Sequence, residues 1–154
     1  MILQGSLCGP MNERDKPMIV RLLVAGFLLA HGAIHAGFIS PRPPATAGGP
    51  PWPFELGRSW ILSPLGVDPM VLRFVGLALV AATLAGLALG AVGALGILPP
   101  SVSAPSAAVG AVASMALLLL FFHPWLVLGL LIDVVLLWAV LVAGWRPDAI
   151  GIET

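Results

Sequence analysis

Four long apolar stretches, separated by segments rich in proline and glycine, constrain this chain more than any other feature of its sequence. An α-helix takes about 20 residues to cross the hydrocarbon core of a bilayer, and the first of these stretches is long enough to do so. Only 9% of the residues are charged, whereas about 25% are charged in an ordinary soluble domain. The sequence therefore predicts an all-α fold, an integral membrane four-helix bundle.

Prolines and tryptophans set the predicted boundaries of these spans, because a proline disfavours helix at the residue before it and tryptophan prefers the membrane–water interface. A polar N-terminal tail covers 1–17, a single transmembrane domain covers 18–146, and a C-terminal tail covers 147–154. The Pro- and Ser-rich segment 99–106 is predicted to be a turn. The predicted spans are 18–39, 71–98, 107–122 and 125–145.

The segment 40–70 is predicted to be an extracytoplasmic loop between the first two spans. It is rich in proline and contains Trp52 and Trp60, which suit the membrane–water boundary, and an expected pair of opposite charges, Glu55 and Arg58. Two interpretations are open. The loop is either an interfacial segment lying flat over one mouth of the bundle or a plain surface loop with aromatic anchors.

Charge and cysteine content narrow the possible partners. The net charge is zero and no basic tract is present, which argues against nucleic acid. The single cysteine, Cys8, excludes a disulfide framework. We expect the lipid bilayer to be the main partner, together with other membrane subunits or further copies of this chain.

The distribution of lysine and arginine predicts the orientation of the chain in the membrane. With both termini in the cytoplasm, four basic residues flank the spans on the inner side and three on the outer side. The inner group is Arg14, Lys16, Arg21 and Arg146, and the outer group is Arg42, Arg58 and Arg73.

Ionisable and polar residues in the spans predict where a site lies, because such residues are costly in a membrane. His31 and His35 are four residues apart, so both imidazoles lie on one face of a helix. His31 and Asp133 each lie about 12 Å below the same membrane surface, at a rise of about 1.5 Å per residue. Ser114 falls near the level of His31, and His123 lies at the corner before the last span. We therefore expect these five residues to cluster in the outer half of the bundle.

Three interpretations of this cluster are open. In the first, Asp133 and His31 form a buried hydrogen-bonded pair that joins two helices. In the second, His31, His35 and Asp133 bind a metal ion, or the histidines bind haem. In the third, the cluster handles protons or a polar small molecule such as a quinone head group. His123 has a further interpretation, in which it satisfies free carbonyls at the end of the third span.

Two short stretches carry a resemblance to a known family. Arg21 followed by Leu-Leu-Val-Ala-Gly-Phe-Leu-Leu-Ala-His-Gly resembles the opening helix of DoxX-like four-helix membrane proteins. The stretch from His123 to Asp133 resembles a segment of small bacterial four-span proteins. The long Pro-rich first loop departs from that pattern. The resemblance implies a four-helix bundle, in some members an accessory to redox or quinone-linked complexes, and it transfers no catalytic residue.

No hydrolase, kinase or dinucleotide-binding signature occurs in the sequence. We therefore predict a small polytopic inner-membrane protein, more consistent with a non-catalytic accessory or ligand-binding subunit of a membrane complex than with an enzyme. Two alternatives are open: a haem- or metal-binding membrane redox protein, and a small proton-coupled transporter.

Overall fold

The computed structural model describes residues 16–44, 48 and 52–145. The predicted C-terminal tail and nearly all of the predicted N-terminal tail lie outside these residues. All regular secondary structure in the described ranges is helical. The prediction of an all-α fold with four membrane-length helices is confirmed. The helices long and apolar enough to span a membrane are Met18–Phe38, Pro69–Ala94, Pro100–Leu120 and Pro124–Leu141.

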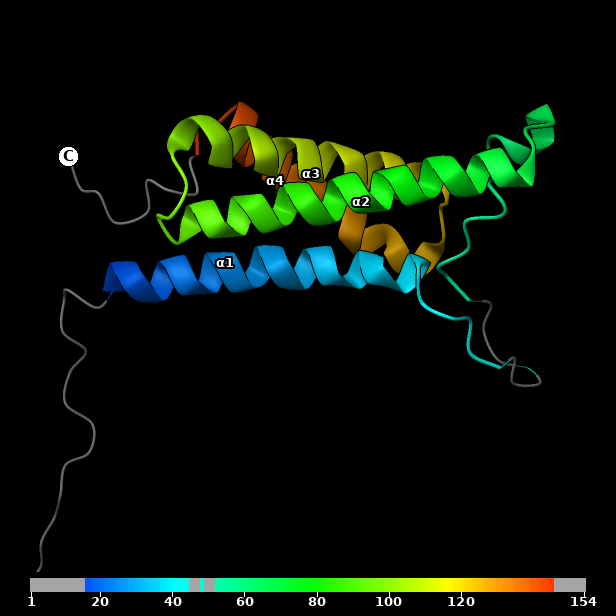
Figure 1. Ribbon diagram of the computed structural model, residues 1–154, viewed down its shortest axis with the longest axis horizontal. Coiled ribbons are helices and arrows are strands. Elements are labelled where there is room, and N and C mark those ends of the chain that lie inside the picture. Colours follow the sequence, from blue (N-terminus) through cyan, green and yellow to red (C-terminus); the bar gives the residue numbers. More distant parts are fainter. Residues whose placement is uncertain (1–15, 45–47, 49–51, 146–154) are drawn as a thin grey trace, which may run out of the picture.

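The helices form a bundle in which chain neighbours are antiparallel (Figure 1). Helix α1 (Lys16–Ile34) packs on α2 (Pro69–Ala94), α2 packs on α3 (Pro100–Leu120), and α3 packs on α4 (Val127–Leu141). The closest of these interfaces is between α2 and α3. By contrast, α1 and α4 share little direct packing. We call the space between these two helices the α1–α4 seam.

The first two helices lie close to their predicted positions. Helix α1 continues into a 3-10 turn, His35–Phe38, so the first span ends near the predicted residue 39. Helix α2 begins slightly earlier than predicted because Asp68 caps it, with its carboxylate accepting a hydrogen bond from Met70 N at 2.7 Å. It ends at Ala94 rather than at 98, since Gly96 adopts a left-handed conformation with φ of 77°.

The third helix corrects the prediction of a turn over 99–106. Helix α3 begins at Pro100, and the N–H groups of Val102 and Ser103 both donate to the carbonyl of Pro99. A proline in the first helical turn has no hydrogen bond to lose, so Pro100 starts the helix instead of breaking it. Pro105 lies inside the helix. The prolines therefore mark the beginning of a longer helix than the sequence predicted.

The fourth span is shorter than the predicted 125–145. A 3-10 turn, Pro124–Leu126, leads into α4, which ends at Leu141. Beyond it, Gly144 has a φ of 65°, and the N–H of Trp145 donates to the carbonyl of Ala139 at 2.8 Å. Trp145 thus lies after the helix, where the chain folds back toward it.

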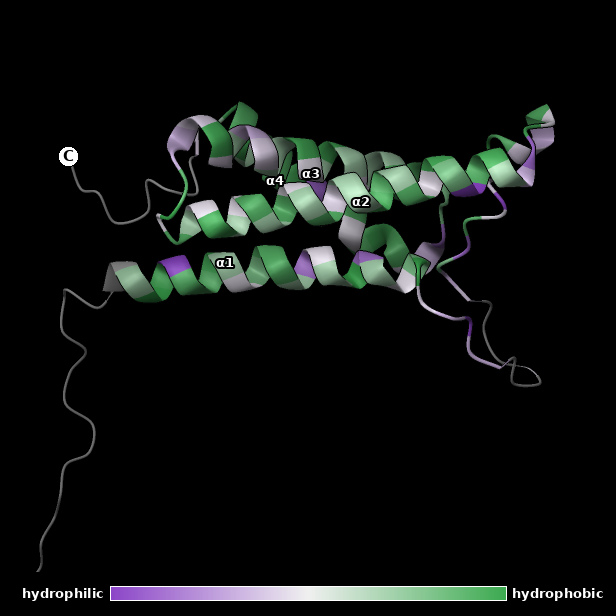
Figure 2. Cartoon of the chain, viewed as in Figure 1, coloured by the Kyte–Doolittle hydropathy of each residue, from purple (hydrophilic) through white to green (hydrophobic). Residues whose placement is uncertain are grey.

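The bundle exposes much apolar surface. The helices are predominantly hydrophobic along their length (Figure 2), and large side chains such as Leu23, Phe74 and Val142 are between 66% and 74% exposed. Soluble monomers rarely expose large contiguous apolar patches. The outer faces of the helices are therefore suited to contact with lipid.

The loop between α1 and α2 packs over one end of the bundle. Leu56 and Ser59 are buried, and Phe54 meets Phe38 edge to face at 5.1 Å between ring centroids. The Ser59 hydroxyl donates to the carbonyl of Leu120 at 2.6 Å. These contacts attach the loop to the end of α3, above the half of the bundle that contains the histidines.

Candidate functional site

A buried chain of four hydrogen-bonded side chains joins three of the helices. His31 Nε2 lies 2.7 Å from Asp133 Oδ1, the Ser114 hydroxyl donates to Asp133 Oδ2 at 2.5 Å, and Ser114 Oγ lies 2.8 Å from His35 Nε2. We call these four residues the His/Asp network. The prediction that His31 and Asp133 form a buried pair is confirmed, and Ser114 and His35 extend that pair.

The His/Asp network is shielded from solvent. His31 and His35 are 3% and 2% exposed, and Ser114 and Asp133 are fully buried. A carboxyl group in an apolar interior needs hydrogen-bond partners, and both oxygens of Asp133 have one. Because α1 and α4 share little packing, the bond between His31 and Asp133 is a polar link across the α1–α4 seam.

The local sequence fixes the two imidazoles in different orientations. Their rings meet edge to face, with centroids 5.3 Å apart. His35 Nδ1 donates to the carbonyl of His31 at 3.0 Å, one turn earlier in the chain. This bond turns the other ring nitrogen of His35 to Ser114 on α3, while His31 reaches Asp133 on α4.

The two histidines also line a small cavity of about 120 Å³ under the loop. Its remaining lining is apolar and includes Phe54, Trp125 and Ile132. His31 Nδ1 is buried without a hydrogen-bond partner among the described residues. Such atoms are uncommon in folded proteins and call for an explanation. The cavity therefore adjoins an imidazole that retains unused hydrogen-bonding capacity.

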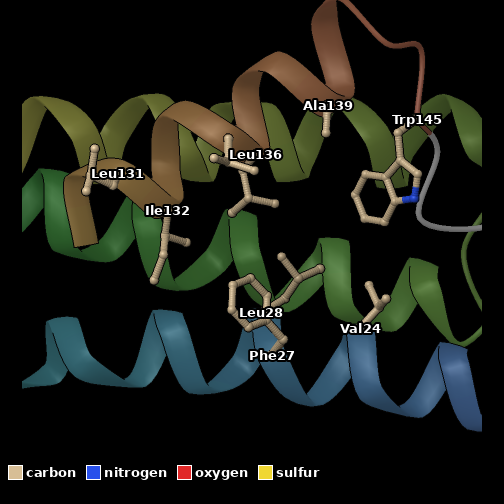
Figure 3. Close-up of a pocket in the computed structure, with 9 residues that line it drawn as sticks. Val24, Phe27, Leu28, Leu131, Ile132, Leu136, Ala139 and Trp145 are labelled. Atoms are coloured by element: carbon tan, nitrogen blue, oxygen red, sulfur yellow. The ribbon is translucent and has the colours of Figure 1, made fainter. Parts of the chain in front are cut away.

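A second, larger space follows the α1–α4 seam away from the loop. It has a volume of about 410 Å³ and is lined by apolar residues and Trp145. Figure 3 shows Val24, Phe27 and Leu28 of α1 across this groove from Leu136 and other α4 side chains. Ile132 lines both this groove and the cavity at the histidines. The two spaces therefore adjoin.

His123 does not join the His/Asp network. It lines a separate cavity of about 700 Å³, together with all four predicted loop residues, Trp52, Glu55, Arg58 and Trp60. Its Nδ1 accepts a hydrogen bond from the N–H of Trp125 at 3.2 Å, so its side chain caps the turn that leads into α4.

Two finer predictions about these residues are wrong. Free carbonyls at the end of α3 accept hydrogen bonds from the loop, not from His123: Trp60 Nε1 donates to the carbonyl of Leu119 at 2.7 Å, and the Ser59 hydroxyl donates to that of Leu120. Glu55 forms an exposed ion pair with Arg42 at 3.8 Å, and not with Arg58 as expected. The first difference arises because the loop folds back onto α3.

The donor atoms predicted for a metal ion are engaged with other groups. His31 Nε2 faces Asp133, and His35 Nδ1 donates to a backbone carbonyl. In the part of the chain that the structure describes, no group of three or more His, Cys, Asp and Glu side chains is arranged to hold a metal ion. A metal on His31, His35 and Asp133 would have to replace the bonds of the network. Binding of haem stays a prediction.

Sequence reasoning missed the groove and one buried hydroxyl. The groove-lining residues of α4 recur at helical spacing and lie on one face of the helix: Leu131, Ile132, Val135, Leu136 and Ala139. Because the other faces of α4 are also apolar apart from Asp133, this spacing does not distinguish the groove-lining face from the rest. Thr83 is fully buried and its Oγ1 has no partner among the described residues. The signal for Thr83 was that, apart from Arg73 near the beginning, it is the one polar side chain of the second span.

Among known proteins, no family model, no curated protein and no solved structure matches the chain. The DoxX-like resemblance therefore stays a prediction.

Proposed function

We propose that this protein is a ligand-binding subunit of a bacterial inner-membrane complex, and that its ligand is an amphiphile with a quinone-type head. The head occupies the cavity at His31 and His35, and the apolar tail lies in the groove of the α1–α4 seam. One observation carries the proposal: a buried polar network borders a cavity that adjoins an apolar groove at Ile132.

The cavity suits a small ring that bears a hydroxyl group. Its volume of about 120 Å³ is of the order of the engineered cavity of about 150 Å³ that binds benzene, so a larger, substituted ring would extend beyond it. When His31 Nε2 donates to Asp133, its Nδ1 is an acceptor without a partner in the described residues. A hydroxyl of a reduced, quinol-type head would donate to that nitrogen once the side chains that bury it move aside.

The groove suits a hydrocarbon tail. Several of its lining residues are also exposed on the outer face of the bundle: Phe27 is 47%, Leu131 56% and Val135 63% exposed. The groove therefore opens toward the region where lipid chains would lie. A ligand with a long apolar tail would enter from the bilayer and not from water.

The proposed orientation places both termini in the cytoplasm and the loop between α1 and α2 outside. It rests on the basic residues that flank the spans. A C-terminal fusion to a fluorescent protein that matures only in the cytoplasm should fluoresce, and an export-dependent phosphatase inserted at Gly48 should be active. The reverse pattern would contradict the orientation and leave the ligand proposal unaffected.

The binding test compares three forms of the full-length protein in nanodiscs. A short-tailed benzoquinol should quench tryptophan fluorescence in the wild type. It should bind about tenfold or more weakly to His31→Phe, which corresponds to a loss of at least ~1.4 kcal/mol of binding free energy. This variant keeps an aromatic ring but loses both ring nitrogens.

His123→Phe is the matched control, because His123 lies in the separate surface cavity. We expect it to bind the quinol with wild-type affinity. Equal affinity of all three forms, or no saturable binding to the wild type, would reject the proposed ligand class.

A further inference from the structure

Each hydrogen bond in the His/Asp network needs one hydrogen atom on one of its two partners. This requirement restricts the protonation states of the network, whether or not a ligand is bound. His35 Nδ1 lies 3.0 Å from the carbonyl oxygen of His31. A carbonyl oxygen can only accept, so this nitrogen must carry a hydrogen. The state of the second nitrogen, Nε2, then decides whether His35 is neutral or positively charged.

Ser114 stands between that nitrogen and the carboxyl group. Its Oγ is 2.8 Å from His35 Nε2 and 2.5 Å from Asp133 Oδ2. A hydroxyl has one hydrogen, so it can donate to only one of these atoms and must accept from the other. If Ser114 donates to Asp133, then His35 donates to Ser114 and is an imidazolium. If Ser114 donates to His35, then Asp133 is protonated and both partners are neutral.

We propose that Ser114 relays a proton between Asp133 and His35. In the transfer, the proton on Asp133 Oδ2 passes to Ser114 Oγ as the hydroxyl proton of Ser114 passes to His35 Nε2. Asp133 becomes a carboxylate, His35 becomes an imidazolium, and the hydroxyl of Ser114 is regenerated. The net charge of the network does not change, and no oxidant or reductant takes part.

His31 keeps the same role in both arrangements. Its Nε2 donates to Asp133 Oδ1, and its Nδ1 has no partner in the described part of the chain. A second proton on His31 would bury an N–H without an acceptor, which costs free energy. The only other buried ionisable side chains among the described residues are His35 and Asp133. The transferable proton is therefore shared between these two.

Two opposing effects act on the relative free energies of the two arrangements. Separating charges in an apolar interior is costly and favours the neutral form. Two hydrogen bonds to the carboxylate, from His31 and Ser114, favour the ionic form. Because His35 lines the cavity, an anionic group bound there would favour the imidazolium. The relay would thus couple the charge of a bound molecule to the protonation of Asp133 on another helix.

The test is ¹⁵N NMR of the full-length protein with labelled histidine, reconstituted in nanodiscs. The His35 signals are assigned by their loss in His35→Gln. In the wild type, we expect Nδ1 to be protonated, and Nε2 to give a shift between those of a bare and a protonated nitrogen that changes with temperature. In Ser114→Ala and in Asp133→Asn, Nε2 should move to the bare position and lose its temperature dependence.

Ser114→Thr is the matched control, because it keeps the hydroxyl and should keep the intermediate shift. His123, outside the network, should show the same signals in every variant. A bare Nδ1 in the wild type would overturn the relay without any variant having to fold, since the network would then be static. An Nε2 shift that matches Ser114→Ala at all temperatures would overturn it as well.

Discussion

At the scale of single residues, Asp133 is the side chain on which the site depends. A charged residue at the centre of a membrane helix raises the free energy of insertion by about 2.5–3.5 kcal/mol. An unpaired carboxyl group would therefore destabilise α4 in the membrane. Here both oxygens are bonded, to His31 and to Ser114. The residue therefore offsets part of its own cost by joining α4 to α1 and α3.

Removing this carboxyl group should destabilise the fold. Asp133→Ala leaves His31 Nε2 without its buried partner and leaves the Ser114 hydroxyl with His35 alone, and we expect the free energy of unfolding to fall by about 1–3 kcal/mol. Asp133→Asn keeps an acceptor oxygen and should cost less. Unfolding by SDS in mixed micelles measures both. Val134→Ala, at the neighbouring half-exposed position, is the control, and equal stability of Asp133→Ala and Val134→Ala would contradict the argument.

Depth along the helices was enough to predict most of the polar cluster. Counting residues from the helix ends placed His31 and Asp133 at one level, and the 2.7 Å bond between them confirms that placement. The same count could not place His123, because a residue at a corner takes its direction from the local backbone. There the N–H of Trp125 needed an acceptor, and His123 supplied it.

At the scale of helices, the contact between α2 and α3 depends on residues without side chains. A Cβ atom on Gly86 would lie 2.5 Å from the backbone nitrogen of Gly110, and one on Gly90 would lie 2.9 Å from the Cβ of Ala107. Small residues let membrane helices approach closely. Helix α1 packs on α2 and helix α4 packs on α3, so the α2–α3 pair is the centre of the bundle.

Gly86→Ala should therefore force α2 and α3 apart and lower the free energy of unfolding by about 1–3 kcal/mol, because rigid backbone cannot yield to the new methyl group. Gly26→Ala is the matched control in α1, where an added Cβ has no atom within 4 Å. That change should leave stability equal or raise it by about 0.5–1 kcal/mol. The same SDS titration compares them, and similar losses in both variants would refute the packing argument.

Helix ends were harder to predict than helices. The Pro-rich segment before Ala107 was predicted to be a turn, yet Pro100 begins α3. The N–H groups of the first helical turn have no partner within the helix, so a proline there loses no hydrogen bond. The sequence left open whether the loop lies over one mouth of the bundle or is a plain surface loop, and it did not show which groups of the bundle the loop contacts. Ser59 belongs to no obvious pattern, and Trp60 was expected only as an aromatic anchor at the membrane boundary. The partners of both residues are backbone carbonyls of α3 far along the chain.

At the scale of the whole molecule, the bundle is open on one side. Four spans follow from composition and length, whereas the order of packing does not, because helices that are apolar all round show no preferred face. The expected pair of His31 and Asp133 brings α1 and α4 together, but the open groove beside that pair could for this reason not be predicted from the sequence. The α1–α4 seam leaves the groove that Figure 3 shows, closed at one end by Trp145.

Filling the groove should separate the binding of the tail from the chemistry of the head. Ala139→Phe places a ring in the groove, and we expect a long-tailed quinol to bind about tenfold more weakly, a loss of ~1.4 kcal/mol. The histidine NMR signals should stay as in the wild type. Val134→Phe, whose side chain does not line the groove, should change neither property. Unchanged affinity in Ala139→Phe would show that the groove is not where the tail binds.

The exposed residues at the edge of the groove determine which concentration would control the binding of a ligand in the α1–α4 seam. Since Phe27, Leu131 and Val135 line the groove and are partly exposed, an amphiphile that bound in the seam would reach it by diffusing in two dimensions, and its effective concentration would be its mole fraction among the lipids. Diluting the sample with buffer would then leave the fraction of protein with bound ligand unchanged, whereas adding ligand-free vesicles would lower that fraction.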